Sequence, residues 1–104
     1  MIRHCVFVKF DLGFSRAQRD AIYADLEALR TKIPGMRHVA AGENVSPEGL
    51  SKGFDEGFFV DFDSAAVRDA YLVHPDHQAI GGRIVAAAQG GTAGIIVFDF
   101  DLAG

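Results

Sequence analysis

The chain has 104 residues, of which 49% are hydrophobic, and a formal net charge of -4 at pH 7. A chain of this length predicts one domain spanning residues 1–104. Its acidic balance and scattered basic residues argue against a nucleic-acid partner or an anionic membrane surface. A single cysteine excludes a disulfide within the chain, and no apolar run approaches the roughly 20 residues that span a bilayer, so we expect a cytoplasmic protein.

The first half of the chain predicts a strand followed by a helix. Residues 2–10 alternate in polarity and are rich in β-branched and aromatic residues, which is typical of a strand. From residue 15 the period changes to that of a helix, with apolar side chains at Ile22, Leu26, Leu29 and Ile33. Ser15 and Gln18 have the spacing of a capping box, and the Pro34-Gly35 pair ends the segment.

Two further strands and a long loop are expected next. Residues 36–45 predict a weaker strand, and residues 58–63 predict a short one. The segment between them is rich in Gly, Ser and Pro, which favours a loop at a rim or an interface.

The remaining residues predict two helices and a last strand. Ser64 can cap a helix that proline interrupts, with His74 closing it and Pro75 opening the next helix, which ends at residues 90–91. Residues 95–102 form the last strand. The predicted order is β-α-β-β-α-α-β, an α+β domain with a four-stranded sheet.

Alternation divides each strand into an apolar and a mixed face, and we expect the helices to cover the apolar one. That face would carry Ile2, His4, Val6 and Val8, together with Phe58, Val60, Phe62, Ile96, Phe98 and Phe100. The open face would then carry Phe7, Phe59, Ile95 and Val97. Leaving such side chains wet costs on the order of 1.5 to 3 kcal/mol each, so a homodimer through this face is predicted. Arg3 and Lys9 would meet Asp61, Asp99 or Asp101, either within one chain or across the interface. A solvated face on a monomer is the alternative.

The stretch YLVHPDHQ, residues 71–78, supplies the candidate site. If it packs over the covered face, His4, Tyr71 and His77 converge in an apolar pocket. Desolvation lowers an imidazole pKa, and a neutral imidazole can take a proton from a carbon acid. We therefore interpret His77 as a base that His4 orients, while Tyr71 polarises a carbonyl. The substrate would also contact Val6, Phe58, Val60 and His74.

Each of these residues also has a structural interpretation. His4 can be a hydrogen-bonded core residue, His74 a helix cap, and Tyr71 a packing residue. HPDH has no further ligand at a recognised spacing, and no phosphate-binding glycine loop or nucleophile elbow is present, so we expect neither a metal nor a cofactor.

Four segments together resemble the stress-responsive dimeric A/B barrel (Dabb) domain, over nearly the whole chain, and are similar to its olivetolic acid cyclase-like members. They are IRHCVFVKF, the stretch from IPGMRHV to FFVDFDS, YLVHPDHQ and IIVFDF. The resemblance implies a ferredoxin-like fold with an antiparallel sheet and a barrel formed across a homodimer. It does not imply one activity. In the cyclase-like members, which close a linear polyketide by aldol condensation without a metal, the base corresponds to His77, the assisting tyrosine to Tyr71 and a histidine lining the site to His4. Glu56 stands where those cyclases have a further pocket histidine.

These observations favour a homodimer that binds a small hydrophobic carbonyl compound between its sheet and its helices. If it is an enzyme, the expected chemistry is that of a cofactor-independent cyclase or lyase. Two alternatives stay open, namely a stress-related binding or structural protein without catalysis, and a cofactor-free monooxygenase.

Overall fold

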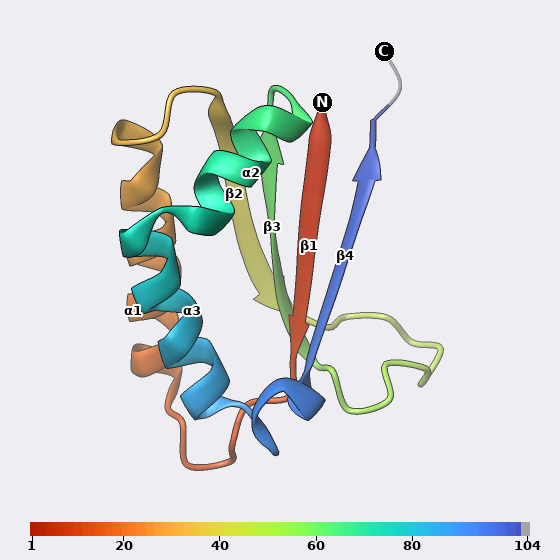
Figure 1. Ribbon diagram of the computed structural model, residues 1–104. Helices are drawn as coiled ribbons and strands as arrows, with labels where there is room; N and C mark the ends of the chain where they lie inside the picture. The colour runs from red at the N-terminus through yellow and green to blue at the C-terminus, as the bar shows by residue number, and fades with distance from the viewer. Residues whose placement is uncertain (103–104) are drawn as a thin grey trace.

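The computed structural model describes residues 1–102 and has a ferredoxin-like α+β fold (Figure 1). Its elements are β1 (Ile2–Val8), α1 (Arg16–Ala28), β2 (Met36–Glu43), β3 (Glu56–Phe62), α2 (Ala65–Val73), α3 (Pro75–Ala87) and β4 (Ile95–Asp101). Short 3-10 turns follow α1 and precede β4. The sheet is antiparallel with strand order β2-β3-β1-β4, and the helices lie against one of its faces. The predicted order of elements is confirmed.

Each helix begins at a side chain that satisfies free backbone N–H groups. Ser15 and Gln18 form the predicted capping box, in which the Gln18 N–H donates to Ser15 Oγ at 3.2 Å. Ser64 accepts from the Val67 N–H at 3.3 Å. His74 ends α2 and also caps α3, because its Nδ1 accepts from the Asp76 N–H at 3.1 Å.

The core lies between the helices and the sheet. The predicted helical stripe of Ile22, Leu26, Leu29 and Ile33 is buried in full. It packs against the inward face of the sheet, which carries Val6, Val8, Phe58, Val60 and Phe62. The covered face of β1 and β3 is therefore the one that alternation predicted.

The predicted face of β4 is wrong. Strand pairing sets Val97 opposite Val6 and Asp99 opposite His4, so Ile95, Val97 and Asp99 point toward the helices. The aromatic side of β4 therefore lies on the open face. Alternation shows which residues share a face, but only register against β1 shows which face meets the helices.

The open face is more apolar than expected because of this reversal. Phe7, Ile96, Phe98 and Phe100 are 41%, 42%, 58% and 41% exposed. Arg3 donates to Asp61 at 2.8 and 2.9 Å, which confirms one of the predicted ion pairs. Lys9 instead lies 4.7 Å from the ring centre of Phe54 in the long loop.

Across residues 1–102, no helix combines the length and the apolar character that a membrane crossing requires.

Candidate functional site

A cavity of about 330 Å³ lies between the inward face of the sheet and helices α2 and α3. Five of the predicted site residues line it: His4, Val6, Phe58, Tyr71 and His77. The remaining walls come from the three helices, the 3-10 turn before β4 and β4 itself, and are apolar except for Thr92. The cavity thus has a polar end, made by two imidazoles and a phenol, and a long apolar side.

Two residues expected to contact a substrate do not line this cavity. Val60 is fully buried within the core of the sheet. His74 joins α2 to α3, where its ring nitrogen is occupied in capping the second helix. The structural interpretation of His74 therefore accounts for its position.

The three candidate catalytic side chains lie in ring contact. The Tyr71 ring centre is 3.9 Å from that of His77 and 5.8 Å from that of His4. Tyr71 is fully buried, and its hydroxyl finds no hydrogen-bond partner within residues 1–102. Burial raises the pKa of Tyr71, so the phenol keeps its proton and stays a hydrogen-bond donor at neutral pH.

His77 is half-buried at the first turn of α3. Burial lowers the pKa of His77 below its ordinary value of 6.5, and the neighbouring imidazoles of His4 and His74 act in the same direction. The Leu72 carbonyl opposes these effects, since it lies 3.4 Å from His77 Nδ1 and can accept its hydrogen. In that arrangement Nε2 is left as the acceptor of a neutral imidazole.

His4 is held by a carboxylate that sequence reasoning placed elsewhere. Asp99 Oδ1 lies 2.7 Å from His4 Nδ1, and Arg68 of α2 donates to Asp99 Oδ2 at 3.0 Å. An ionised Asp99 accepts the Nδ1 hydrogen of His4 and leaves Nε2 as an acceptor. Asp99 was expected on the open face. It alternates in step with Ile95 and Val97, so the correct choice of the covered face of β4 would have placed Asp99 beside His4.

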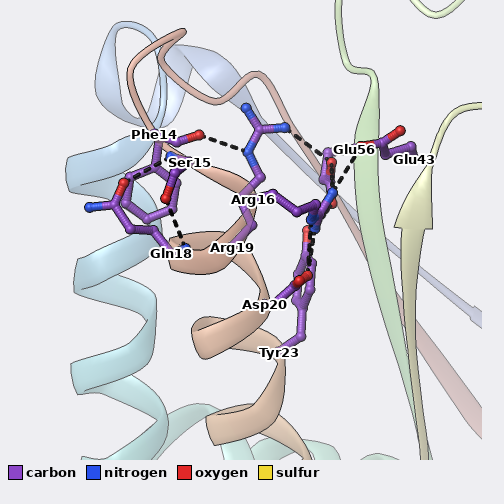
Figure 2. Close-up of polar contacts among 9 residues, drawn as sticks. All are labelled: Phe14, Ser15, Arg16, Gln18, Arg19, Asp20, Tyr23, Glu43 and Glu56. Carbon is purple, nitrogen blue, oxygen red and sulfur yellow. Dashed lines mark hydrogen bonds and ion pairs between the residues drawn. The ribbon is translucent and has the colours of Figure 1, made fainter.

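Glu56 belongs to a separate polar cluster at the other end of the inward face (Figure 2). The side chain is 3% exposed and accepts from Arg16 at 2.8 Å, from Tyr23 at 2.9 Å and from Arg19 at 3.2 Å. Burial opposes ionisation of Glu56 most strongly, but these hydrogen bonds together lower its pKa. Glu56 is thus a satisfied anion that ties α1 to β3, and it does not line the cavity.

The cavity residues include no thiolate and no carboxylate. In the part of the chain that the structure describes, no three His, Cys, Asp or Glu side chains are grouped so that they could hold a metal ion.

The sequence and the fold of this chain are similar to those of known proteins. The profile of the stress responsive A/B barrel domain matches residues 2–102. The chain belongs to this family. It is also 26% identical to olivetolic acid cyclase of Cannabis sativa over 80 residues, which cover 77% of this chain and 79% of the cyclase.

Solved structures of Dabb-like proteins share the fold. A dimeric ferredoxin-like protein of unknown function from Jannaschia sp. CCS1 is 32% identical, with a TM-score of 0.90 over 97% of this chain and 98% of that one. A hydroxynitrile lyase from Passiflora edulis is 24% identical, with a TM-score of 0.84 over 98% of this chain and 93% of the lyase. The predicted family and ferredoxin-like fold are therefore confirmed.

Proposed function

We propose that this Dabb protein binds a small hydrophobic carbonyl compound in the cavity and moves a proton at the carbon next to the carbonyl. The observation that carries the proposal is the Tyr71 hydroxyl, a buried donor without a partner within residues 1–102, on a cavity residue whose ring contacts those of His4 and His77. A buried polar group without a partner is costly, and a ligand carbonyl would satisfy it.

The proposed step uses groups of this chain alone. His77 Nε2 takes a proton from the α-carbon, the electron pair of the broken C–H bond forms the C=C bond of the enolate, and the π pair of the carbonyl moves to its oxygen. Tyr71 donates a hydrogen bond to the enolate oxygen, which is the preorganised-donor role. The imidazolium of His77 then returns a proton to carbon. Alternatively, the enolate carbon attacks a second carbonyl of the same molecule, and the alkoxide that forms there takes the proton from His77. His4, held by Asp99, keeps an acceptor nitrogen toward the site.

A proton-exchange assay tests this step without knowledge of the natural substrate. We expect the protein to bind hexanophenone and to speed the exchange of its α-hydrogens for deuterium in heavy water, followed by NMR. His77→Ala should abolish the catalysed exchange while the variant stays folded. His38→Gln is the matched control, because His38 is an exposed histidine on the opposite face of the sheet. Equal exchange by wild type and His77→Ala would remove His77 from the mechanism.

Binding without turnover is the second candidate function. His4 Nδ1 already has a partner in Asp99, and His77 Nδ1 lies near the Leu72 carbonyl, as expected of histidines that complete a ligand-binding core. Saturable binding of hexanophenone without faster exchange in the wild type would favour this function over catalysis.

We also propose that two copies pair through the open face of the sheet. The support is the row of exposed apolar side chains Phe7, Ile96, Phe98 and Phe100, together with the dimeric state named for the Jannaschia protein. Removing apolar surface from water contributes about 25 cal/mol per Å² to the free energy. Covering these side chains is therefore the main favourable contribution to dimer formation. Two sheets packed face to face would form a barrel across the pair.

Sedimentation of the purified protein tests the pairing. A dimer is expected at micromolar concentration, and Phe98→Lys should shift it to a monomer because a charge would be buried at the interface. Val73→Lys makes the same kind of change at an exposed position of α2 and should leave the dimer intact. A monomeric wild type would contradict the proposal.

A further inference from the structure

Tyr71 and His77 belong to different helices, which meet at His74. Helix α2 ends at Val73 and α3 begins at Pro75. Tyr71 therefore lies three residues before His74, and His77 lies three residues after it. The two helices run in different directions, yet the ring centres of Tyr71 and His77 are 3.9 Å apart (Figure 1). The distance between the two rings thus depends on how the chain is held at His74.

His74 makes hydrogen bonds to both helices. Its N–H donates to the Tyr71 carbonyl at 3.1 Å, and its carbonyl accepts from the Gln78 N–H at 3.0 Å. Its ring Nδ1 accepts from the Asp76 N–H at 3.1 Å. Pro75 has no N–H, so the Asp76 N–H is the first that α3 offers. The two main-chain bonds do not involve the side chain, so a substitution at His74 would remove only the bond from Asp76.

This side-chain bond is an uncommon form of helix cap. Ser, Thr, Asp and Asn are the usual capping residues, and an imidazole can replace them only when it is neutral and carries its hydrogen on Nε2. The backbone at His74 is extended, with φ -66° and ψ 129°, as is typical of a cap residue and of a residue before proline. The ring therefore reaches the Asp76 N–H from a backbone conformation that Pro75 already favours.

Other side-chain contacts hold the start of α3 less firmly. Lys32 donates to Asp76 Oδ2 at 2.6 Å, but the two side chains are 58% and 43% exposed, and an exposed ion pair contributes little to stability. His77 Nδ1 lies 3.4 Å from the Leu72 carbonyl, which is long for a hydrogen bond. His77 directly follows Asp76, so the cap fixes the backbone from which the His77 ring projects.

We propose that His74 is a positioning residue, whose cap on α3 holds the His77 ring against Tyr71 for proton transfer. The inference rests on the proposed function, in which His77 is the base and Tyr71 donates to the enolate oxygen. His74 does not line the cavity, so it acts through the first turn of α3 and not through contact with the ligand. A displacement of about 1 Å can slow a reaction on the order of a hundredfold, so a loose first turn would lower turnover more than binding.

Three variants test this inference in the exchange of hexanophenone α-hydrogens. His74→Ala removes the cap, and His74→Asn keeps a neutral acceptor at the same position. Ser15→Ala is the matched control, because it removes the cap of α1, a helix that carries no proposed catalytic residue. We expect His74→Ala to lower kcat by about tenfold or more, with KM within about twofold. His74→Asn should restore kcat to within about twofold of the wild type, and Ser15→Ala should leave it unchanged.

NMR of the free protein reports the ring geometry independently of turnover. A strong nuclear Overhauser effect is expected between the ring hydrogens of Tyr71 and His77 in the wild type, because the ring centres are 3.9 Å apart. It should weaken in His74→Ala and persist in His74→Asn and Ser15→Ala. Thermal unfolding should show similar decreases in Tm for His74→Ala and Ser15→Ala, so that lost stability alone cannot explain a difference in kcat.

The outcomes separate this inference from the proposed function. If the wild type does not speed the exchange, the proposed function is overturned, and with it the role of His74 in that reaction. If the wild type is active but His74→Ala keeps its kcat or its ring contact, or loses no more kcat than Ser15→Ala, only the role of His74 is overturned. The same holds if His74→Asn loses as much kcat as His74→Ala, because the cap would then not be the cause. If His74→Ala does not fold, His74→Gly takes its place with the same loss expected, since glycine also lacks a side-chain acceptor but is tolerated as a helix cap.

Discussion

Replacing Tyr71 by phenylalanine should stabilise the protein and impair its proposed function. The side chain is fully buried, and its hydroxyl has no hydrogen-bond partner among residues 1–102. A buried polar group in that condition costs about 1 to 3 kcal/mol, and the substitution removes the group while keeping the ring and its contacts with Phe62 and His77. We expect the free energy of unfolding to rise by about 1 kcal/mol.

Tyr23 provides the matched comparison. It is a partly buried tyrosine on α1, and its hydroxyl donates to the carboxylate of Glu56 at 2.9 Å. A hydrogen bond to a charged group contributes about 1.5 to 3 kcal/mol, so Tyr23→Phe should lower the free energy of unfolding by roughly that amount. The same chemical change is thus expected to have opposite signs at the two positions.

Urea and thermal unfolding measure both variants. In a domain of this size, 1 kcal/mol corresponds to a Tm change of about 4 to 8 °C, which is readily resolved. Tyr71→Phe should at the same time slow the exchange of hexanophenone α-hydrogens by about a hundredfold, because the enolate loses its donor. Destabilisation of Tyr71→Phe to the same extent as Tyr23→Phe would refute the reasoning, since it would mean that the Tyr71 hydroxyl is already well bonded.

Three further outcomes are expected. Exchange should be fully active at neutral pH and decline on acidification with a midpoint below 6.5 in a pH–rate profile, because only neutral His77 accepts a proton and burial lowers its pKa. Glu56→Gln should lower the free energy of unfolding by about 1.5 to 3 kcal/mol in urea titrations, because Arg16 and Arg19 lose their charged hydrogen-bond acceptor. Asp99→Asn should slow exchange while leaving hexanophenone affinity within about twofold, because it weakens the orientation of His4 and the bond from Arg68 without changing a residue that lines the cavity.

The acid dependence of stability follows from the same cluster. The pKa of Glu56 is lower in the folded protein than its ordinary value of 4.5, since the bonds from Arg16, Tyr23 and Arg19 outweigh the burial that opposes ionisation. Its contribution to stability is therefore fully present above 4.5 and is lost as the pH falls through the lowered folded value. In Glu56→Gln this part of the acid dependence, measured by urea titration at several pH values, should be absent.

Much of this structure was predictable because it depends on neighbours in the chain. The capping box of Ser15, the cap at Ser64 and the division of two helices at Pro75 all depend on residues within four positions of one another. Alternation in β1 also placed His4 on the face that the helices were expected to cover. The structure brings His4, Tyr71 and His77 to one cavity. Their roles in binding and proton transfer stay proposals.

The sequence by itself determined the order of elements, the residues at which the helices begin and the residues that share each strand face, whereas α1 and α3 end earlier than predicted, at Ala28 and Ala87. Only the tertiary structure decided that Asp99 bonds His4, that Phe98 lies on the open face and that Glu56 is held by α1. His4 and Asp99 are separated by 95 residues, and their contact depends on the register of β4 against β1. A strand alternates with a period of two whichever of its faces meets the helices. Which face is covered is therefore decided by the packing of the whole domain.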